Sequence, residues 1–101
     1  MAKMTHEEAS KLLAAVPEEN VFWCQDGSVF KSVEELKDAL ARMSDETFAL
    51  HVTADKNDFS AWTRTTVKDS KLATDLDKAG SRTLALKRVE ERLAFLRDRL
   101  S

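Results

Sequence analysis

The pattern of apolar and polar positions predicts a chain that is mostly helical. Along most of the sequence, apolar residues recur at steps of three and four, the spacing of one face of an α-helix. The exception is a pair of short apolar runs at 21–24 and 29–30, which flank Asp26 and Gly27, a pair that favours a tight β-hairpin turn. We expect one mainly α domain of five or six helices over residues 1–101, with an N-terminal helix at 5–16, a β-hairpin at 20–31 and a helical remainder at 32–100.

Capping motifs mark where several helices begin. Thr5 with Glu8, and Ser32 with Glu35, have the spacing of capping boxes, in which each side chain bonds the other's backbone amide. Ser44 is placed to cap the next short helix. Each motif precedes an apolar stripe, so the capping motifs and the apolar periodicity predict the same helix starts.

The helix ends are predicted from proline, glycine and the last apolar stripe. Pro17 should end the first helix, and Gly80 should supply a left-handed residue after the helix that begins at Asp69 or Ser70. The last helix carries a seam with the spacing of a coiled coil, but over only about two and a half heptads, so we favour a helix that closes the core. The seam consists of Leu86, Val89, Leu93, Leu96 and Leu100.

The predicted hairpin has apolar residues on both faces. A two-residue turn at 26–27 would place Trp23 opposite Phe30 and Cys24 opposite Val29. Because a two-stranded ribbon is marginal alone, helices must cover at least one face, and the pattern leaves open whether they cover both. An uncovered face would be an apolar patch, made of Val21, Trp23 and Phe30 or of Phe22, Cys24 and Val29.

A stretch from His51 to Trp62 holds the densest group of side chains able to cap, bond and pack. Residues 53–56 have no apolar period and are expected to form a polar connector. Asn57 and Asp58 are candidate caps of the following helix, in which Phe59 and Trp62 share an apolar face.

His51 is the one residue in this stretch that invites a chemical interpretation. With Asp55 or Asp58 as an orienting partner it could act as a general base, but a base also needs a pocket and a proton within reach. We favour a buried histidine bonded to the polar corner. Cys24 has no histidine or basic neighbour in sequence, so nothing predicts a reactive thiolate. We expect no catalytic residue, no metal site and no cofactor.

One ordered set of residues runs through the chain from the hairpin turn to the helix that begins near residue 70. It consists of Asp26-Gly27, residues 43–46, Phe48, His51-Val52, Lys56, Asn57, Asp58, Phe59, Trp62 and Leu72-Ala73. This order resembles a family of small prokaryotic domains, largely archaeal, catalogued as a domain of unknown function. The resemblance covers roughly residues 20–100, and it implies a fold without an activity. The chain has Thr53 and Thr63 where that family usually has Asn and Ile.

Composition narrows the classes of function. Hydrophobic residues make up 43% and charged residues 34% of the chain, as in a charge-rich globular protein, and the net charge of −2 argues against general affinity for phosphate backbones. No apolar run reaches membrane-spanning length, and the N-terminus lacks the layout of a signal peptide. A single cysteine cannot form an internal disulfide, so we expect a cytoplasmic protein.

These observations favour a non-catalytic protein-interaction or adapter module that binds another protein or itself. A small enzyme or ligand-binding domain centred on His51 is an alternative. Nucleic-acid binding is the least favoured alternative, because aspartates are interleaved with Arg64, Lys68 and Lys71. The candidate interaction residues are Trp23, Phe30, His51, Lys56, Asn57, Asp58, Phe59 and Trp62.

Overall fold

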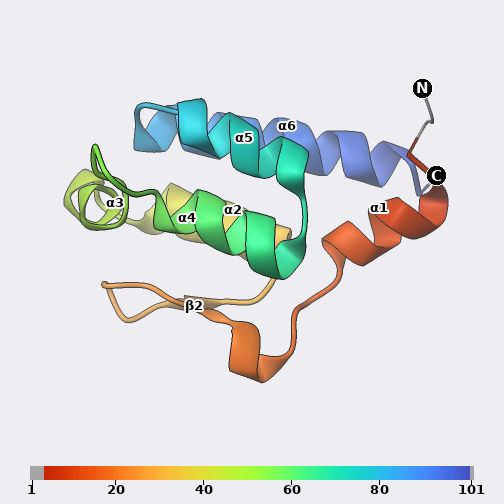
Figure 1. Cartoon of the computed structure of the whole chain (residues 1–101), viewed down its shortest axis with the longest axis horizontal. Helices are drawn as coiled ribbons and strands as arrows, with labels where there is room; N and C mark the ends of the chain where they lie inside the picture. The colour runs from red at the N-terminus through yellow and green to blue at the C-terminus, as the bar shows by residue number, and fades with distance from the viewer. Residues whose placement is uncertain (1–3, 101) are drawn as a thin grey trace.

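The computed structural model describes residues 4–100 and contains a mainly helical domain with one β-hairpin near its start, as predicted (Figure 1). The hairpin comes between the first and second α-helices, and every later element is helical. The elements are α1 (His6–Leu13), η1 (Glu18–Asn20), β1 (Phe22–Trp23), β2 (Val29–Phe30), α2 (Val33–Arg42), α3 (Asp45–His51), α4 (Asp58–Trp62), η2 (Thr63–Val67), α5 (Ser70–Lys78) and α6 (Arg82–Asp98).

The elements are arranged in three levels, with α1 at one end (Figure 1). Helices α5 and α6 form the upper level, α2, α3 and α4 the middle one, and the hairpin lies below α2 and α4. Helix α6 packs along α2, α5 and α1, and it buries Ala85, Val89, Leu93 and Leu96. The last helix therefore closes the core, as favoured over a coiled coil.

Two of the predicted capping motifs form as expected and one forms in part. Thr5 Oγ1 accepts the amide of Glu8, while the Glu8 carboxylate accepts the amide of Thr5. Ser44 Oγ accepts the amide of Thr47 and so caps α3. Ser32 caps α2 in the same way, but the Glu35 carboxylate accepts the amide of Lys31 rather than that of Ser32.

The first helix ends earlier than predicted. It stops at Leu13, and Ala14 is extended, with ψ 152°. The chain then runs beside the end of the hairpin, where the amide of Val16 donates to the carbonyl of Lys31 at 2.7 Å. Because a residue before proline avoids helical backbone angles, Pro17 disfavours a helical conformation at Val16, and the bond to Lys31 holds Val16 beside the hairpin instead.

The prediction of a left-handed residue at Gly80 is wrong. Helix α5 ends at Lys78, and Ala79 donates its amide to the carbonyl of Leu76 with φ −79°. The left-handed residue of this region is Lys68 (φ 70°), which ends η2. The next residue, Asp69, is buried, caps α5 and accepts two hydrogen bonds from the Arg92 guanidinium at 2.8 and 3.0 Å, which ties α5 to α6.

The predicted hairpin register is wrong by one residue. Phe22 pairs with Phe30 and Trp23 pairs with Val29. The loop has three residues instead of two, because the amide of Cys24 donates to the carbonyl of Ser28 at 2.9 Å and Gly27 has φ 90°. This is the geometry of a turn followed by a left-handed glycine bulge, which shifts the pairing of every later residue.

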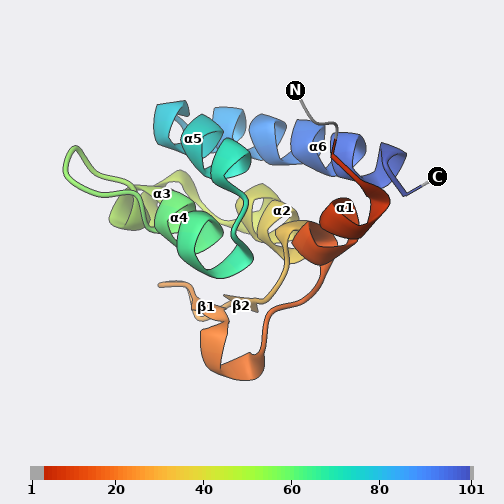
Figure 2. The same ribbon diagram turned by 45° about the vertical axis from the view of Figure 1, so that its right-hand side comes forward.

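The shifted register sorts the hairpin into one apolar face toward the core and one toward solvent. Phe22, Cys24 and Phe30 point inward and are buried, whereas Trp23 and Val29 point outward. In both ribbon views no α-helix of the described chain lies on the outward side, which only the short η1 approaches (Figures 1 and 2). Neither predicted patch is correct as a set, since each combined residues from the two faces.

Candidate functional site

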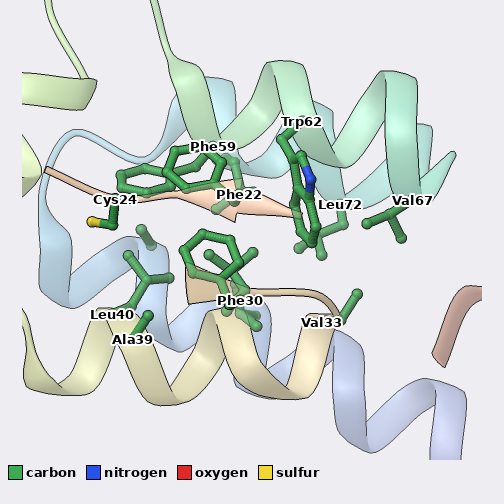
Figure 3. Packing of buried hydrophobic residues seen from close by; sticks show 14 of the residues in the cluster. Phe22, Cys24, Phe30, Val33, Ala39, Leu40, Phe59, Trp62, Val67 and Leu72 are labelled. Carbon is green, nitrogen blue, oxygen red and sulfur yellow. The ribbon is translucent and has the colours of Figure 1, made fainter. Parts of the chain in front are cut away.

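The inner face of the hairpin meets the corner between α3 and α4 through a ring cluster. Phe22 stacks on Phe30 with ring centroids 4.6 Å apart, and on Phe59 at 5.2 Å. The indole of Trp62 meets Phe30 edge-on at 5.1 Å (Figure 3). These rings seal the hairpin against α4, and Phe30, which was predicted as an interaction residue, is 1% exposed.

The His51 ring is buried at this corner and bonded through both of its nitrogens. Nδ1 lies 3.0 Å from Asp58 Oδ2, and the amide of Gln25 donates to Nε2 at 3.1 Å. Because the Gln25 amide is a donor, Nε2 must accept, so the ring proton is on Nδ1 and is donated to Asp58. We call Cys24, Gln25, His51 and Asp58 the His51 cluster. It fastens the hairpin tip to the start of α4.

The pKa of the Asp58 carboxyl depends on burial and on two hydrogen-bond donors. Burial raises the pKa of its carboxyl, but the hydrogen bonds from Lys56 and His51 outweigh this and hold the pKa below its usual value. The Lys56 ammonium lies 2.9 Å from the same oxygen that faces His51. Lys56 belongs to the polar connector, so the predicted signature residues His51, Lys56 and Asp58 do come together.

Cys24 brings the cluster close to the arrangement of a thiol enzyme. Its Sγ lies 3.6 Å from His51 Nε2, and His51 is oriented in turn by Asp58. However, the lone pair of Nε2 already accepts the Gln25 amide, and burial raises the pKa of the Cys24 thiol. Both features favour the neutral thiol over the thiolate that such chemistry requires.

The contact between Cys24 and His51 was not predicted from the sequence. Cys24 and His51 are 27 residues apart, and no local pattern links them. The alternation of the strand was the available signal, because Cys24 must share the face of Phe22, and an inward Phe22 brings Cys24 to the same corner.

The remaining signature residues have structural partners. Asn57 Oδ1 accepts the amide of Ser60 and caps α4, while its Nδ2 donates to the carbonyl of Leu76 at 3.0 Å. The indole N–H of Trp62 donates to the carbonyl of Asn20 at 2.8 Å. Asn57 is thus the cap, and the carboxylate of Asp58 is used for His51 and Lys56 instead.

The outer face of the hairpin, defined as Val21, Trp23 and Val29, is the main exposed apolar feature near this corner. The Trp23 side chain is 75% exposed and that of Val29 is 44% exposed. Beside them lies an open groove of about 390 Å³, whose lining adds Glu18, Lys31 and Glu35. Trp23 and Phe30 were both predicted as interaction residues, but the observed strand register places them on opposite faces of the hairpin.

A second hollow of the described surface lies between α1 and the junction of η2 with α5, and its lining includes Leu12, Val67 and the bonded pair Asp69 and Arg92. Further hollows are lined in part by side chains that pair with each other. Lys71 pairs with Asp75 and Arg88 with Glu91 in two such hollows between α5 and α6. Within residues 4–100, no three His, Cys, Asp or Glu side chains gather in a way that could hold a metal ion. In the same range, no helix has the length and apolar character needed to cross a membrane.

A scan of protein-family models, a search of curated proteins and a search of solved structures each find no match to this chain. The resemblance to a prokaryotic domain of unknown function stays a prediction.

Proposed function

We propose that this chain is a non-catalytic protein-interaction module that binds its partner through the outer face of the hairpin. The observation that carries the proposal is the exposure of Trp23, 75%, on a face that none of the α-helices in residues 4–100 covers. An exposed indole is costly in water and is the side chain most often found at the energetic centre of protein interfaces.

The two tryptophans of the chain support this interpretation by contrast. Trp62 is buried and donates its indole N–H to Asn20. Trp23 has neither burial nor, within the described residues, a hydrogen-bond partner for its N–H. The inward rings already seal the hairpin, so stability does not require an indole at position 23.

The size of the outer face favours a limited contact over an obligate dimer. A stable interface buries about 800 Å² on each partner, whereas one aromatic side chain contributes about 150 to 250 Å². Phe95 is 38% exposed but cannot enlarge the face, because it belongs to α6, which lies at the opposite level of the molecule from the hairpin (Figure 2). The guanidinium groups of Arg92 and Arg99 lie over its ring. A short segment of a partner protein fits this area best.

An enzyme centred on His51 is the second candidate, favoured by the Cys24–His51–Asp58 geometry. It is weaker because Nε2 already accepts a backbone amide and because the thiol is 7% exposed and lines none of the hollows described above. Nucleic-acid binding is weaker still, since Arg64 and Lys71 are paired with Asp77 and Asp75.

The test begins with affinity capture and identification of a partner, followed by titration of the two purified proteins. We expect Trp23→Ala to weaken the affinity by about 30-fold, the effect of losing roughly 2 kcal/mol at an interface hot spot. The melting temperature should not change, since the indole packs against little. Leu50→Ala is the matched control, because Leu50 is also exposed (58%) but lies on α3.

The proposal is tested by comparing the partner affinities of wild type, Trp23→Ala and Leu50→Ala. Equal binding of the same partner by wild type and Trp23→Ala would overturn the proposal. Loss of affinity in Trp23→Ala, with Leu50→Ala binding as tightly as wild type, would support it.

A further inference from the structure

We infer that the partner segment presents a cationic side chain, best an arginine, to the groove beside Trp23. This inference rests on the proposed function and names the chemistry of the partner. The groove joins one exposed indole to two carboxylates, Glu18 and Glu35, from separate elements, with Lys31 on its rim. An aromatic face flanked by carboxylates is the arrangement that recognises a positive charge.

Both carboxylates have oxygens available for a ligand. Glu18 begins η1, is exposed, and has no bonding partner for its side chain among residues 4–100. Glu35 lies in the first turn of α2, where one of its oxygens accepts the amide of Lys31 at 3.0 Å and the other has no partner in the described chain. The two side chains approach the groove from η1 and from α2, so a ligand between them meets both.

The apolar part of the groove suits the rest of an arginine side chain. A guanidinium stacks flat on an indole, and its methylene stem packs against aliphatic groups such as those of Val21 and Val29. Its planar fork can also donate to a carboxylate in pairs, which the compact ammonium of lysine does less well. A neutral or acidic segment would leave the two carboxylates with only the Lys31 ammonium as a counter-charge in the groove.

Among residues 4–100, Lys31 is the single positively charged side chain that lines the groove. It opposes an incoming cation, but two carboxylates outnumber it. The sign of its effect is therefore a direct test: removing the Lys31 ammonium should strengthen binding of a cationic segment and weaken binding of an acidic one.

A second copy of this chain is a poorer occupant. Its arginines on α6 are used elsewhere, since Arg92 bonds Asp69, Arg88 pairs with Glu91 and Arg97 pairs with Glu34. Self-association through the outer face is retained as an outcome of the test.

The experiment is a titration of the protein with three short synthetic peptides of alternating valine and a variable residue. The variable residue is arginine, citrulline or glutamate. Citrulline has the shape of arginine without its charge, so the difference in affinity between these two peptides measures the contribution of the positive charge. The readout is the pair of indole N–H signals in a two-dimensional NMR spectrum, assigned with Trp23→Phe. We expect the arginine peptide to shift the Trp23 signal and leave that of Trp62 unmoved.

The variants sharpen the result. We expect the arginine peptide to bind at least about fivefold more tightly than the citrulline peptide, within the range of a cation–π contact and exposed ion pairs. Glu18→Gln combined with Glu35→Gln should remove this preference, and Lys31→Ala should increase it. Gln at position 35 keeps an oxygen for the Lys31 amide, so the start of α2 is preserved.

Three outcomes would overturn the inference: equal binding of the arginine and citrulline peptides, no effect of the paired glutamine substitutions, or self-association that Trp23→Ala abolishes. If these occur while the captured partner still depends on Trp23, the proposed function stands and only its cationic chemistry fails. If Trp23→Ala leaves partner binding intact, both fail.

Discussion

The His51 ring has no free nitrogen, and this decides what the residue can do. Asp58 accepts from Nδ1 and the Gln25 amide donates to Nε2. A general base needs a lone pair that can take a proton from a substrate, and here that lone pair is occupied by the backbone. The cluster therefore acts as a fastening between the hairpin and the helical corner.

Removing the acceptor of His51 should destabilise the protein. In Asp58→Ala the buried Nδ1–H loses its partner, which costs about 1 to 3 kcal/mol of unfolding free energy. Urea denaturation followed by circular dichroism measures the change. Asp58→Asn should cost less, because its amide oxygen can still accept the proton.

Asp55→Ala is the matched control for this prediction. Asp55 is exposed on the same connector, and only its backbone amide is bonded, to Thr53. We expect a change within about 0.5 kcal/mol. If Asp55→Ala and Asp58→Ala were equally mild, His51 would not depend on Asp58 for stability.

The carboxyl of Asp58 also predicts a dependence on pH. Burial raises its pKa, the hydrogen bonds from Lys56 and His51 lower it by more, and the net direction is below the ordinary value of 3.8. A lowered pKa in the folded state gives stability that is complete above the unfolded value and is lost as pH falls through the folded value. The gap in unfolding free energy between wild type and Asp58→Asn should therefore close below about pH 4. A gap that stays constant down to about pH 2 would contradict this.

At the scale of elements, the conformation of the hairpin loop depends on one glycine. Gly27 has φ 90° and lies at the bulge that sets the register. A Cβ there would meet nothing within 4 Å, so the cost of Gly27→Ala comes from the backbone angle alone. We expect a loss of about 1 to 2 kcal/mol in unfolding free energy, measured by urea denaturation.

Gly80→Ala provides the opposite expectation in the same chain. A Cβ at Gly80 also meets nothing within 4 Å, and its φ is not positive. Alanine should stabilise by about 0.4 to 1 kcal/mol, because it restricts the unfolded chain. If both substitutions shifted stability in the same direction, the left-handed angle at Gly27 would not be the cause.

Local patterns carried most of the prediction of elements. Helical periodicity and the Thr5 and Ser44 caps depend on residues within a few positions of each other, and each appears in the structure. A hairpin also forms around Asp26 and Gly27, but with a loop of three residues instead of the predicted two. The end of the first helix was less predictable, because the amide of Val16 donates to the carbonyl of Lys31, a residue that is distant in sequence.

The candidate site was less predictable for a related reason. Which hairpin residues are buried depends on whether the loop has two or three residues, and both fit Asp26 and Gly27. One residue of difference moved Phe30 into the core and left Trp23 exposed. Local sequence does not encode that choice; the observed register is the one that packs Phe22 and Phe30 against Phe59 and Trp62 of α4.

At the scale of the whole molecule, ion pairs connect elements across the surface. Arg82 pairs with Asp45 and Arg97 with Glu34, each linking α6 to an earlier helix. Exposed pairs add little stability individually, but they neutralise the cations of α6. Neither Glu18 nor Glu35, which line the groove beside Trp23, takes part in an ion pair among the described residues.

The hairpin and the helices should unfold as one unit, because Phe22 and Phe30 belong to the same buried cluster as Leu36, Phe59 and Leu93. A domain with one shared core loses all its structure in a single cooperative step. In Trp23→Phe, the only remaining tryptophan is Trp62, whose indole bonds the segment just before β1.

Fluorescence of that variant reports on the contact between hairpin and α4, while circular dichroism at the helical wavelengths reports on all six α-helices within residues 4–100. We expect the two urea denaturation curves to coincide in midpoint and slope, as they must for a two-state transition. A fluorescence transition at clearly lower urea would mean that the hairpin detaches first. The outer face would then be carried by a segment that opens independently, and binding at Trp23 would be coupled to local unfolding.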